Sequence, residues 1–320
     1  MRSWLPVLAC LPALLLAACG GDDEEGTPAL EGGLPPGQGG TLVWAVADRV
    51  ESIDPLHADT RSEQLVSRQV HEPLIQTLSG PFGDTREVPG LVRRARPSAD
   101  ETVWTLTLRT GVRFQDGAQF NSQAVLANAE RWTANPAGQA LLPGLLTFDA
   151  PRVDQVRFTL AAPDPGFDDR LAADALGIVS PKVLSGRPAA ATIPRGASES
   201  GTGPFELRER SPGRLLMARN ASWWGTAGQT ELGPALDQVE FRVEPESSVR
   251  LALLDAGDAH LADELEAAQA RQASVDPLLT TLPAGDGTAL GLERSVRGVD
   301  SARTLPALSG VWLTTIRVPD

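Results

Sequence analysis

The stretch from Val103 to Phe120 decides the fold: Val-Trp-Thr-Leu-Thr-Leu-Arg-Thr-Gly-Val-Arg-Phe-Gln-Asp-Gly-Ala-Gln-Phe. Its first six residues alternate in polarity, and a pleated strand would place Trp104, Leu106 and Leu108 on one face. Turn signals follow at residues 110–111 and 116–117, with alternation resuming between them. The pattern therefore predicts a β-hairpin.

A helix is expected directly after the hairpin. Asn121 or Ser122 can cap it, because both side chains accept hydrogen bonds from the free N–H groups of a first helical turn. The apolar residues that follow recur at helical spacing on one face: Val125, Leu126, Ala129 and Trp132. A hairpin followed by a helix occurs in many folds and identifies no function by itself.

Similar short-range patterns predict elements elsewhere in the chain. Residues 42–47 are an apolar run suited to a buried strand, and residues 65–78 have helical spacing until Pro73 ends the helix near His71. Residues 205–218 indicate a second hairpin around Ser211-Pro212-Gly213. Further predictions are strands at 156–160 and 236–243, a helix at 267–273, a final strand at 311–318, and a helix from Ser247 to Gly257 with Val249, Leu253 and Leu254 on one face.

Four segments resemble the family 5 extracellular solute-binding proteins, the peptide- and nickel-binding lipoproteins that serve ABC importers, and they occur along the chain in the same order as in that family. Besides residues 103–120, they are Asp54-Pro55 with Glu72-Pro73-Leu74, Gly201-Thr-Gly-Pro-Phe205 with Asn220-Ala-Ser-Trp-Trp-Gly225, and Leu236-Asp-Gln-Val-Glu-Phe-Arg242. Residues 178–182 look like a strand end of that family. The resemblance implies an α/β fold of the type II periplasmic-binding-protein kind with two lobes.

Several positions depart from the family pattern. Ala124 stands where the family has an acidic residue, and His260 where it has aspartate; we expect both changes to concern capping or local packing. The segment that opens the second-lobe helix of the family is not recognisable here. We therefore expect a first lobe over residues 41–265 and a reduced second lobe or irregular segment over 266–320.

Composition restricts the class of partner. The 320-residue chain has a net charge of -13 and 42% hydrophobic residues, which is typical of an acidic globular protein large enough for a sizeable core. Basic residues are not clustered, so nucleic acid is not an expected partner. We expect no cofactor, and we expect the protein to be a monomer.

The N-terminus has the pattern of a targeting segment, predicted to cover residues 1–18. The apolar stretch after Arg2 is too short to span a bilayer, and Leu16-Ala-Ala-Cys19 resembles the bacterial lipobox, which predicts lipidation of Cys19. Cys10 is a weaker candidate, and an ordinary secretory signal remains an alternative. Residues 19–40, rich in glycine, proline and acidic residues, would then be a flexible tether that holds the protein outside the cytoplasm at the membrane surface.

Residue types that carry catalysis are not grouped in this sequence. The three histidines, His57, His71 and His260, lack metal-ligand spacing, so neither a metal site nor an enzyme is expected. The segment from Gly196 to Ser200 falls one residue short of a nucleophile elbow. The Gly-Thr-Gly at 201–203 lacks the lysine and the helix start that a phosphate-binding loop requires.

The resemblance places the ligand cleft beside the loop after the first strand. In this chain the loop holds Asp48, Arg49 and Glu51, so Asp48 or Glu51 is a candidate contact for an α-amine and Arg49 for a carboxylate; an ordinary charged surface loop is the alternative. The tryptophans at 104, 132, 223 and 224 are expected to pack in the core rather than stack on a ligand.

Two functions of different class remain open. The first is a lipid-anchored binding protein that delivers a solute to the permease of an ABC importer, with a peptide as the default solute and a nickel complex or a sugar as alternatives. The second is a scaffold or partner-docking lipoprotein that no longer binds solute, which the shortened C-terminal portion would favour.

Overall fold

The computed structural model describes residues 39–79, 85–88, 90–194, 199–226, 236–276, 279–283 and 290–294. The predicted leader, Cys19, most of the predicted tether and the predicted strand at 311–318 lie outside these residues. None of the helices formed by the described residues is long and apolar enough to cross a membrane.

A seven-stranded sheet has β1 near its centre. β1 runs parallel to both of its neighbours, β10 and β11, and the other pairings are antiparallel. In sheet order the strands are β12 (Leu279–Pro283), β13 (Leu290–Arg294), β11 (Leu261–Ala262), β1 (Thr41–Val46), β10 (Gln238–Val243), β9 (Arg214–Arg219) and β8 (Phe205–Ser211).

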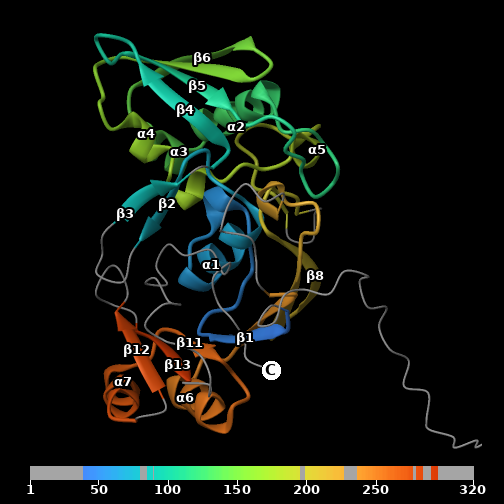
Figure 1. The fold of residues 1–320 in the computed structure, drawn as a ribbon, viewed down its shortest axis with the longest axis vertical. Coiled ribbons are helices and arrows are strands. Elements are labelled where there is room, and N and C mark those ends of the chain that lie inside the picture. The colour runs from blue at the N-terminus through green and yellow to red at the C-terminus, as the bar shows by residue number, and fades with distance from the viewer. Residues whose placement is uncertain are drawn as a thin grey trace, which may run out of the picture. The chain divides into compact units, whose positions relative to one another are not determined.

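Helices cover both faces of this sheet because β1 is apolar on both sides. Leu42, Trp44 and Val46 pack with α1 (Arg61–Val70), while Ala45, which points the other way, packs with α6 (Ser247–Ala256) and α7 (Ala267–Ser274). Figure 1 shows α1 and α6 on either side of β1. The first strand is thus buried on both faces, as its apolar sequence predicts.

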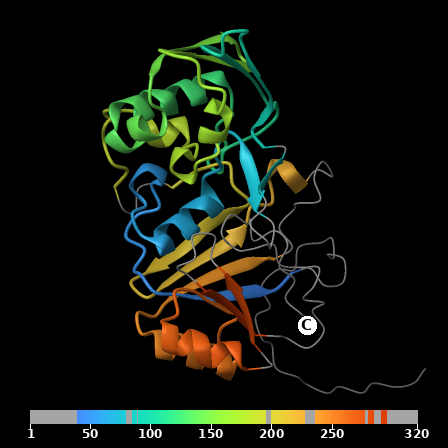
Figure 2. The ribbon, with the colours of Figure 1, turned by 90° about the vertical axis from the view of Figure 1, so that its left-hand side faces the viewer.

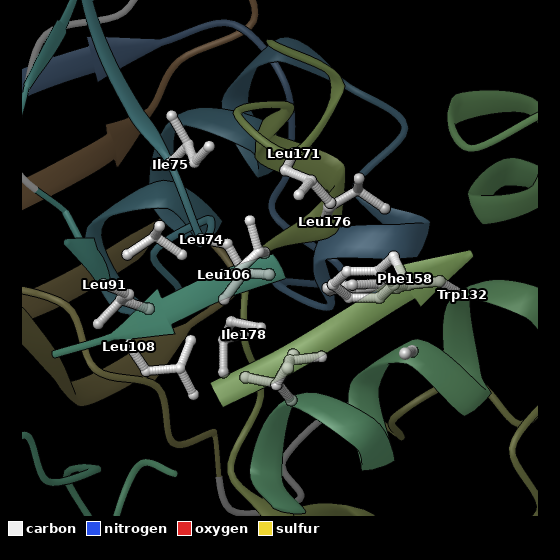
Figure 3. Packing of buried hydrophobic residues seen from close by; sticks show 14 of the residues in the cluster. Leu74, Ile75, Leu91, Leu106, Leu108, Trp132, Phe158, Leu171, Leu176 and Ile178 are labelled. Carbon is white, nitrogen blue, oxygen red and sulfur yellow. The ribbon is translucent and has the colours of Figure 1, made fainter. Parts of the chain in front are cut away.

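The decisive stretch forms the interior of a second, antiparallel sheet. The order is β4 (Val92–Pro97), β5 (Val103–Leu108), β7 (Gln155–Leu160) and β6 (Leu145–Arg152). One face of this sheet is covered by α2 (Ser122–Ala134), followed by α3 (Pro136–Leu141) (Figure 2). Figure 3 shows the shared core, in which Phe158 of β7 lies beside Trp132 of α2, and Leu106 and Leu108 of β5 belong to the same cluster.

Short elements connect the two sheets. They are the two-stranded sheet of β2 (Gln76–Ser79) and β3 (Thr85–Val88), the helices α4 (Phe167–Arg170) and α5 (Pro181–Leu184), and the 3-10 helices η1 (Pro55–His57), η2 (Asp174–Leu176) and η3 (Trp224–Thr226).

The strand at 103–108 is confirmed with its faces, since Trp104, Leu106 and Leu108 are buried. The predicted hairpin is wrong, because β5 pairs with β4 and β7; residues 112–120 instead turn back on themselves through a bridge between Arg113 and Gln119. The helix that follows is confirmed, with Asn121 as its cap: the Asn121 side chain accepts a hydrogen bond from the Ala124 N–H at 3.1 Å.

Two further predictions need correction. Residues 178–182 do not end a strand, because Ser180 caps the short helix α5, which starts at Pro181. In α6, Leu254 is buried and Leu253 packs against the core as predicted, but Val249 is exposed and the buried side chains include Arg250 and Leu251.

Candidate functional site

The carboxyl ends of three adjacent parallel strands form one edge of the seven-stranded sheet. Since β1 lies between β10 and β11 and runs parallel to both, the segments after these strands start at the same edge. They are residues 47–51, 244–246 and 263–266. Their charged residues are Asp48, Arg49, Glu51, Glu244, Glu246, Asp263, Glu264 and Glu266. Ligands of open α/β sheets commonly bind outside the carboxyl ends of parallel strands, so this carboxyl edge is the first candidate site.

A buried carboxylate fixes the segment after β1. Glu63 of α1 is 5% exposed and accepts hydrogen bonds from four backbone N–H groups, those of Glu51 and Ser52 at 2.9 and 2.8 Å and those of Asp59 and Thr60 at 3.0 and 3.3 Å. The Thr60 hydroxyl in turn accepts a hydrogen bond from the Glu63 N–H, which completes a capping box. The loop after β1 is therefore tied to the start of α1.

The three residues predicted to contact ligand all lie on this fixed loop. The Asp48 N–H donates to the Ser62 hydroxyl at 3.1 Å, and the Asp48 side chain is half-buried, whereas Arg49 and Glu51 are exposed. The backbone of this segment is therefore held in place while charged side chains of both signs extend from it. No solute contact of these residues is tested by this arrangement, and their role stays a prediction.

A buried arginine fixes the segments after β10 and β11. Arg250 of α6 is 2% exposed and donates hydrogen bonds to four carbonyl oxygens: those of Glu244 and Pro245, both at 2.7 Å, and those of Asp263 and Glu264 at 3.0 and 2.6 Å. One guanidinium thus joins two of the three segments. Sequence analysis missed this residue, because an arginine on a helix is ordinarily exposed.

Asp263, directly after β11, is the least satisfied charged group at the carboxyl edge. It is 1% exposed, and neither carboxylate oxygen accepts a hydrogen bond from any described residue. The Nε atom of Arg61, the first residue of α1, lies 3.9 Å from Oδ2. Burial raises the pKa of Asp263 to about 7, aided by the charge of Glu264 and opposed by those of Arg61 and Arg250.

Sequence analysis did not predict Asp263 or Arg61 as site residues. A usable signal was present, since Asp263 follows a short apolar pair in the way that Asp48 follows the first strand. That signal becomes specific only once β11 is known to lie parallel to β1.

A second polar cluster, around Asp54, joins the segment before α1 to α2 and to the segment around Ile193. Asp54 is 3% exposed, pairs with Arg131 of α2, and accepts a hydrogen bond from the Ile193 N–H at 2.9 Å. Burial alone would raise the pKa of Asp54, but the positive charge of Arg131 and the Ile193 N–H hold it below its ordinary value. His57 lies 3.1 Å from the same carboxylate and 3.0 Å from the Asn135 amide. These contacts explain the Asp54-Pro55 motif as structural.

A third cluster brings two sequence motifs together at Glu72. The Glu72 carboxylate is fully buried and accepts hydrogen bonds from Gln76 at 2.8 Å and from the indole N–H groups of Trp223 and Trp224 at 3.2 and 2.9 Å. Burial raises the pKa of Glu72 to about 7, although these donors act in the opposite direction. The two tryptophans therefore contribute to structural packing, and Trp104 and Trp132 are buried as well.

The histidines and the Gly-Thr-Gly segment have structural contacts in the described part of the chain. Within the described ranges, no group of three histidine, cysteine or acidic residues could hold a metal ion. His260 accepts a hydrogen bond from the Val43 N–H at 2.9 Å, and burial lowers the pKa of His71 to about 4. Gly201 packs so closely on α1 that a Cβ atom there would lie 2.0 Å from the Val70 carbonyl oxygen. Glycine is therefore required by packing.

A surface hollow of about 260 Å³ lies away from the carboxyl edge. It lies between α2 and the segment around α5, and its lining includes Glu130, Arg131, Leu184 and Arg187. None of its lining residues belongs to the segments after β1, β10 or β11. Because the hollow lies away from the carboxyl ends of the parallel strands, we place the candidate site at the carboxyl edge.

Comparisons with known proteins agree with the fold. The model of "Bacterial extracellular solute-binding proteins, family 5 Middle" matches residues 86–296. The probable D,D-dipeptide-binding periplasmic protein DdpA of Escherichia coli K12 is 30% identical over 230 residues, which is 70% of this chain and 43% of the relative. The glutathione-binding protein GsiB of Salmonella choleraesuis is 30% identical over 228 residues, covering 69% and 41%. The chain thus spans less than half the length of these relatives.

Solved structures show the same architecture. A DppA periplasmic binding protein from Helicobacter pylori, in complex with the peptide STSA, superposes with a TM-score of 0.65 at 24% identity, covering 77% of this chain and 51% of that one. NikA from Brucella suis, in complex with Fe(III)-EDTA, gives 0.64 at 22% identity, covering 76% and 48%. The fold is the mixed α/β fold of type II periplasmic binding proteins. With the family model matching well over half of its residues, this chain belongs to family 5 of the bacterial extracellular solute-binding proteins.

Proposed function

We propose that this protein is an extracytoplasmic solute-binding protein that delivers a peptide-like solute to the permease of an ABC importer. Family membership supports the class, and the names of its relatives, which mention a D,D-dipeptide and glutathione, support a peptide-like solute. The observation that carries the proposal is the preorganised carboxyl edge, where Glu63 and Arg250 fix all three loops by their backbones. Loops fixed in this way lose little conformational entropy when a solute binds.

Within that site, we assign the charged ends of the solute to the loop after β1. Arg49 would meet a carboxylate, and Asp48 or Glu51 an ammonium group, because these side chains are at least partly exposed on a fixed backbone. Charge-assisted hydrogen bonds of this kind orient a peptide by its termini.

Thermal unfolding of the purified full chain tests the solute-binding proposal. The probes are glutathione, a D,D-dipeptide, the dipeptide Met-Leu, the peptide STSA and Fe(III)-EDTA. A solute that binds the native state must raise the melting temperature, by an amount that grows with its concentration. We expect a shift with at least one peptide, which Arg49→Gln reduces and the control Arg96→Gln, exposed on β4, leaves unchanged. The absence of a shift with every probe would favour the scaffold interpretation.

The anchoring proposal has its own test. The chain has two cysteines, Cys10 and Cys19, and we propose that Cys19 carries the lipid. Mass spectrometry and detergent partitioning of protein expressed in bacteria should show acylation that Cys19→Ser abolishes and Cys10→Ser preserves. Acylation of a Cys19→Ser variant would contradict the assignment.

A further inference from the structure

The surface hollow between α2 and the segment around α5 has walls that are tied to each other by buried hydrogen bonds. Asn128 of α2 is fully buried, donates to the Val179 carbonyl at 2.8 Å and accepts from the Val179 N–H at 3.0 Å. Val179 lies just before α5, and Figure 1 shows α5 near α2. The two walls of the hollow are therefore held in a fixed relation before anything binds between them.

Arg187 carries an unused pair of donors at this hollow. It is exposed, and its Nε atom donates to the Val183 carbonyl at 2.9 Å. Its terminal atoms Nη1 and Nη2 have no hydrogen-bond or ion-pair partner among the described residues. A guanidinium held through Nε presents these two nitrogens as a planar fork, which matches the two oxygens of a carboxylate.

Arg131, in the α2 wall, has buried donors without acceptors. Its side chain is 3% exposed, and Nη2 is engaged with Asp54. Its Nε and Nη1 atoms have no hydrogen-bond partner in the described part of the chain. Buried donors without a partner are costly and uncommon in folded proteins. The α2 wall of the hollow therefore lacks an acceptor that a bound anion would supply.

The remaining lining is mostly apolar. It includes Ala127, Pro181, Leu184, Pro188, Ala189 and Ala191. At about 260 Å³ the hollow is larger than an engineered cavity of about 150 Å³ that holds benzene. A ligand that fits this lining combines one acidic group with a compact apolar body.

We propose that this hollow is a second binding site, which takes a small organic carboxylate. The acid group lies against Arg187 and Arg131, and the apolar body lies against Leu184 and the prolines of the α5 segment. None of the lining residues belongs to the carboxyl edge, so this site does not depend on the proposed solute site.

The charges around the hollow favour an anion. Among the lining residues Glu130 is the one acid, and it is exposed, so water and salt screen its charge. The charge of Arg131 is partly compensated by Asp54, so the fork of Arg187 supplies most of the attraction. A ligand of the same shape without a charge should therefore bind more weakly.

Isothermal titration of the full chain with benzoate and with its neutral counterpart benzamide tests the inference. We expect the wild-type chain to bind benzoate about tenfold more tightly, because a charge-assisted bidentate contact is stronger than a neutral one. Arg187→Gln should lose this preference. Ala127→Leu extends an apolar side chain from α2 into the hollow and should weaken binding of both probes. Arg131 is not substituted, because its buried pair with Asp54 supports the fold.

Arg96→Gln, an exposed substitution on β4, is the matched control and should bind both probes as the wild type does. Equal binding of benzoate and benzamide, an unchanged preference in Arg187→Gln, or unchanged binding in Ala127→Leu would overturn the inference. So would a wild-type chain that does not bind benzoate, or a preference lost only in Arg49→Gln, which would place the acid group at the carboxyl edge. The peptide-dependent melting shift should persist in Arg187→Gln and Ala127→Leu, so the two proposals fail independently.

Discussion

The Asp54–Arg131 pair is buried, and its two partners lie on segments far apart in sequence. Replacing Asp54 by asparagine would leave the Arg131 guanidinium charged and uncompensated in the interior. We expect a loss of about 3–5 kcal/mol in the free energy of unfolding, because breaking one side of a buried ion pair costs far more than the pair itself contributes. Urea denaturation of the full chain, followed by tryptophan fluorescence, measures it.

The matched control for this prediction is the pair formed by Asp149 and Arg157, at 2.6 Å on the second sheet. Both side chains are about half exposed (53% and 48%), so Asp149→Asn should cost less than about 1 kcal/mol. Similar losses for the two variants would show that the Asp54 pair is not shielded from water.

Glu72 gives a prediction about pH. Its pKa is about 7 in the folded protein and 4.5 when exposed, so between these values the folded state binds more protons than the unfolded state. The contribution of Glu72 to stability is therefore full below pH 4.5 and is lost as the pH rises through about 7, with a slope of up to about 1.4 kcal/mol per pH unit. Denaturation at pH 5 and pH 8 should show a decline that is smaller in Glu72→Gln.

Glu130→Gln, an exposed substitution on α2, is the control and should retain the full wild-type decline. If Glu72→Gln retained it too, the carboxyl of Glu72 would titrate at its ordinary pKa.

The buried environments of Asp54 and Glu72 could not be predicted from the sequence. Glu72-Pro73-Leu74 was visible as a motif, but the donors that surround its glutamate include Trp223 and Trp224 from a distant segment.

Helix α6 shows how one element organises the carboxyl edge. Replacing Arg250 by methionine keeps most of its volume and removes the donors to four carbonyl oxygens. We expect a loss of about 3 kcal/mol, because several polar groups lose their partner at once. Hydrogen exchange should accelerate first in residues 244–246 and 263–266, the segments that Arg250 joins.

Arg271→Met on α7 is the control, because Arg271 is exposed and should change the free energy of unfolding by no more than about 0.5 kcal/mol. Exchange that accelerated equally across the seven-stranded sheet in Arg250→Met would contradict a local role for the arginine.

Elements with strong local signals could be predicted from sequence. The alternation at 103–108, the cap at Asn121 and the turn around Pro212 each lie within a few residues, and the structure has β5, α2 and the β8–β9 pair there. Pairing was less predictable: β5 pairs with β7 and not with the residues just after it, because Phe158 and Val156 of β7 complete its apolar face. Local patterns contain no record of such distant partners.

The candidate site was less predictable than the elements, because its residues come from segments that are distant in the sequence. Asp48, Arg49 and Glu51 follow a strand that is evident in the sequence, so their position at a strand end could be expected. Asp263 and Arg61 come together only through the parallel pairing of β1 with β11 and the capping of α1 against the first loop. That pairing depends on the topology of the whole sheet.

One segment links the two sheets of the described part of the molecule by hydrogen bonds. The segment at 200–205 lies between them: the Gly203 N–H donates to the Val70 carbonyl of α1 at 2.9 Å. Gln115, from the turn after β5, donates to the carbonyls of Gly203 and Phe205 at 3.3 and 2.8 Å. This segment is therefore hydrogen-bonded to α1 on one side and to the turn after β5 on the other, and it should couple the unfolding of the two sheets.

Substitution of Gly201 by alanine tests that coupling. A Cβ atom there would lie 2.0 Å from the Val70 carbonyl oxygen, and backbone cannot rotate away as a side chain can. We expect a loss of about 3 kcal/mol or more, with both sheets affected together in hydrogen exchange. Gly213→Ala, in the β8–β9 turn with nothing within 4 Å of its Cβ position, should stay within about 0.5 kcal/mol of wild type. If Gly201→Ala accelerated exchange in one sheet alone, the two sheets would be separate cooperative units, because a strained connection shared by one unit must weaken all of it.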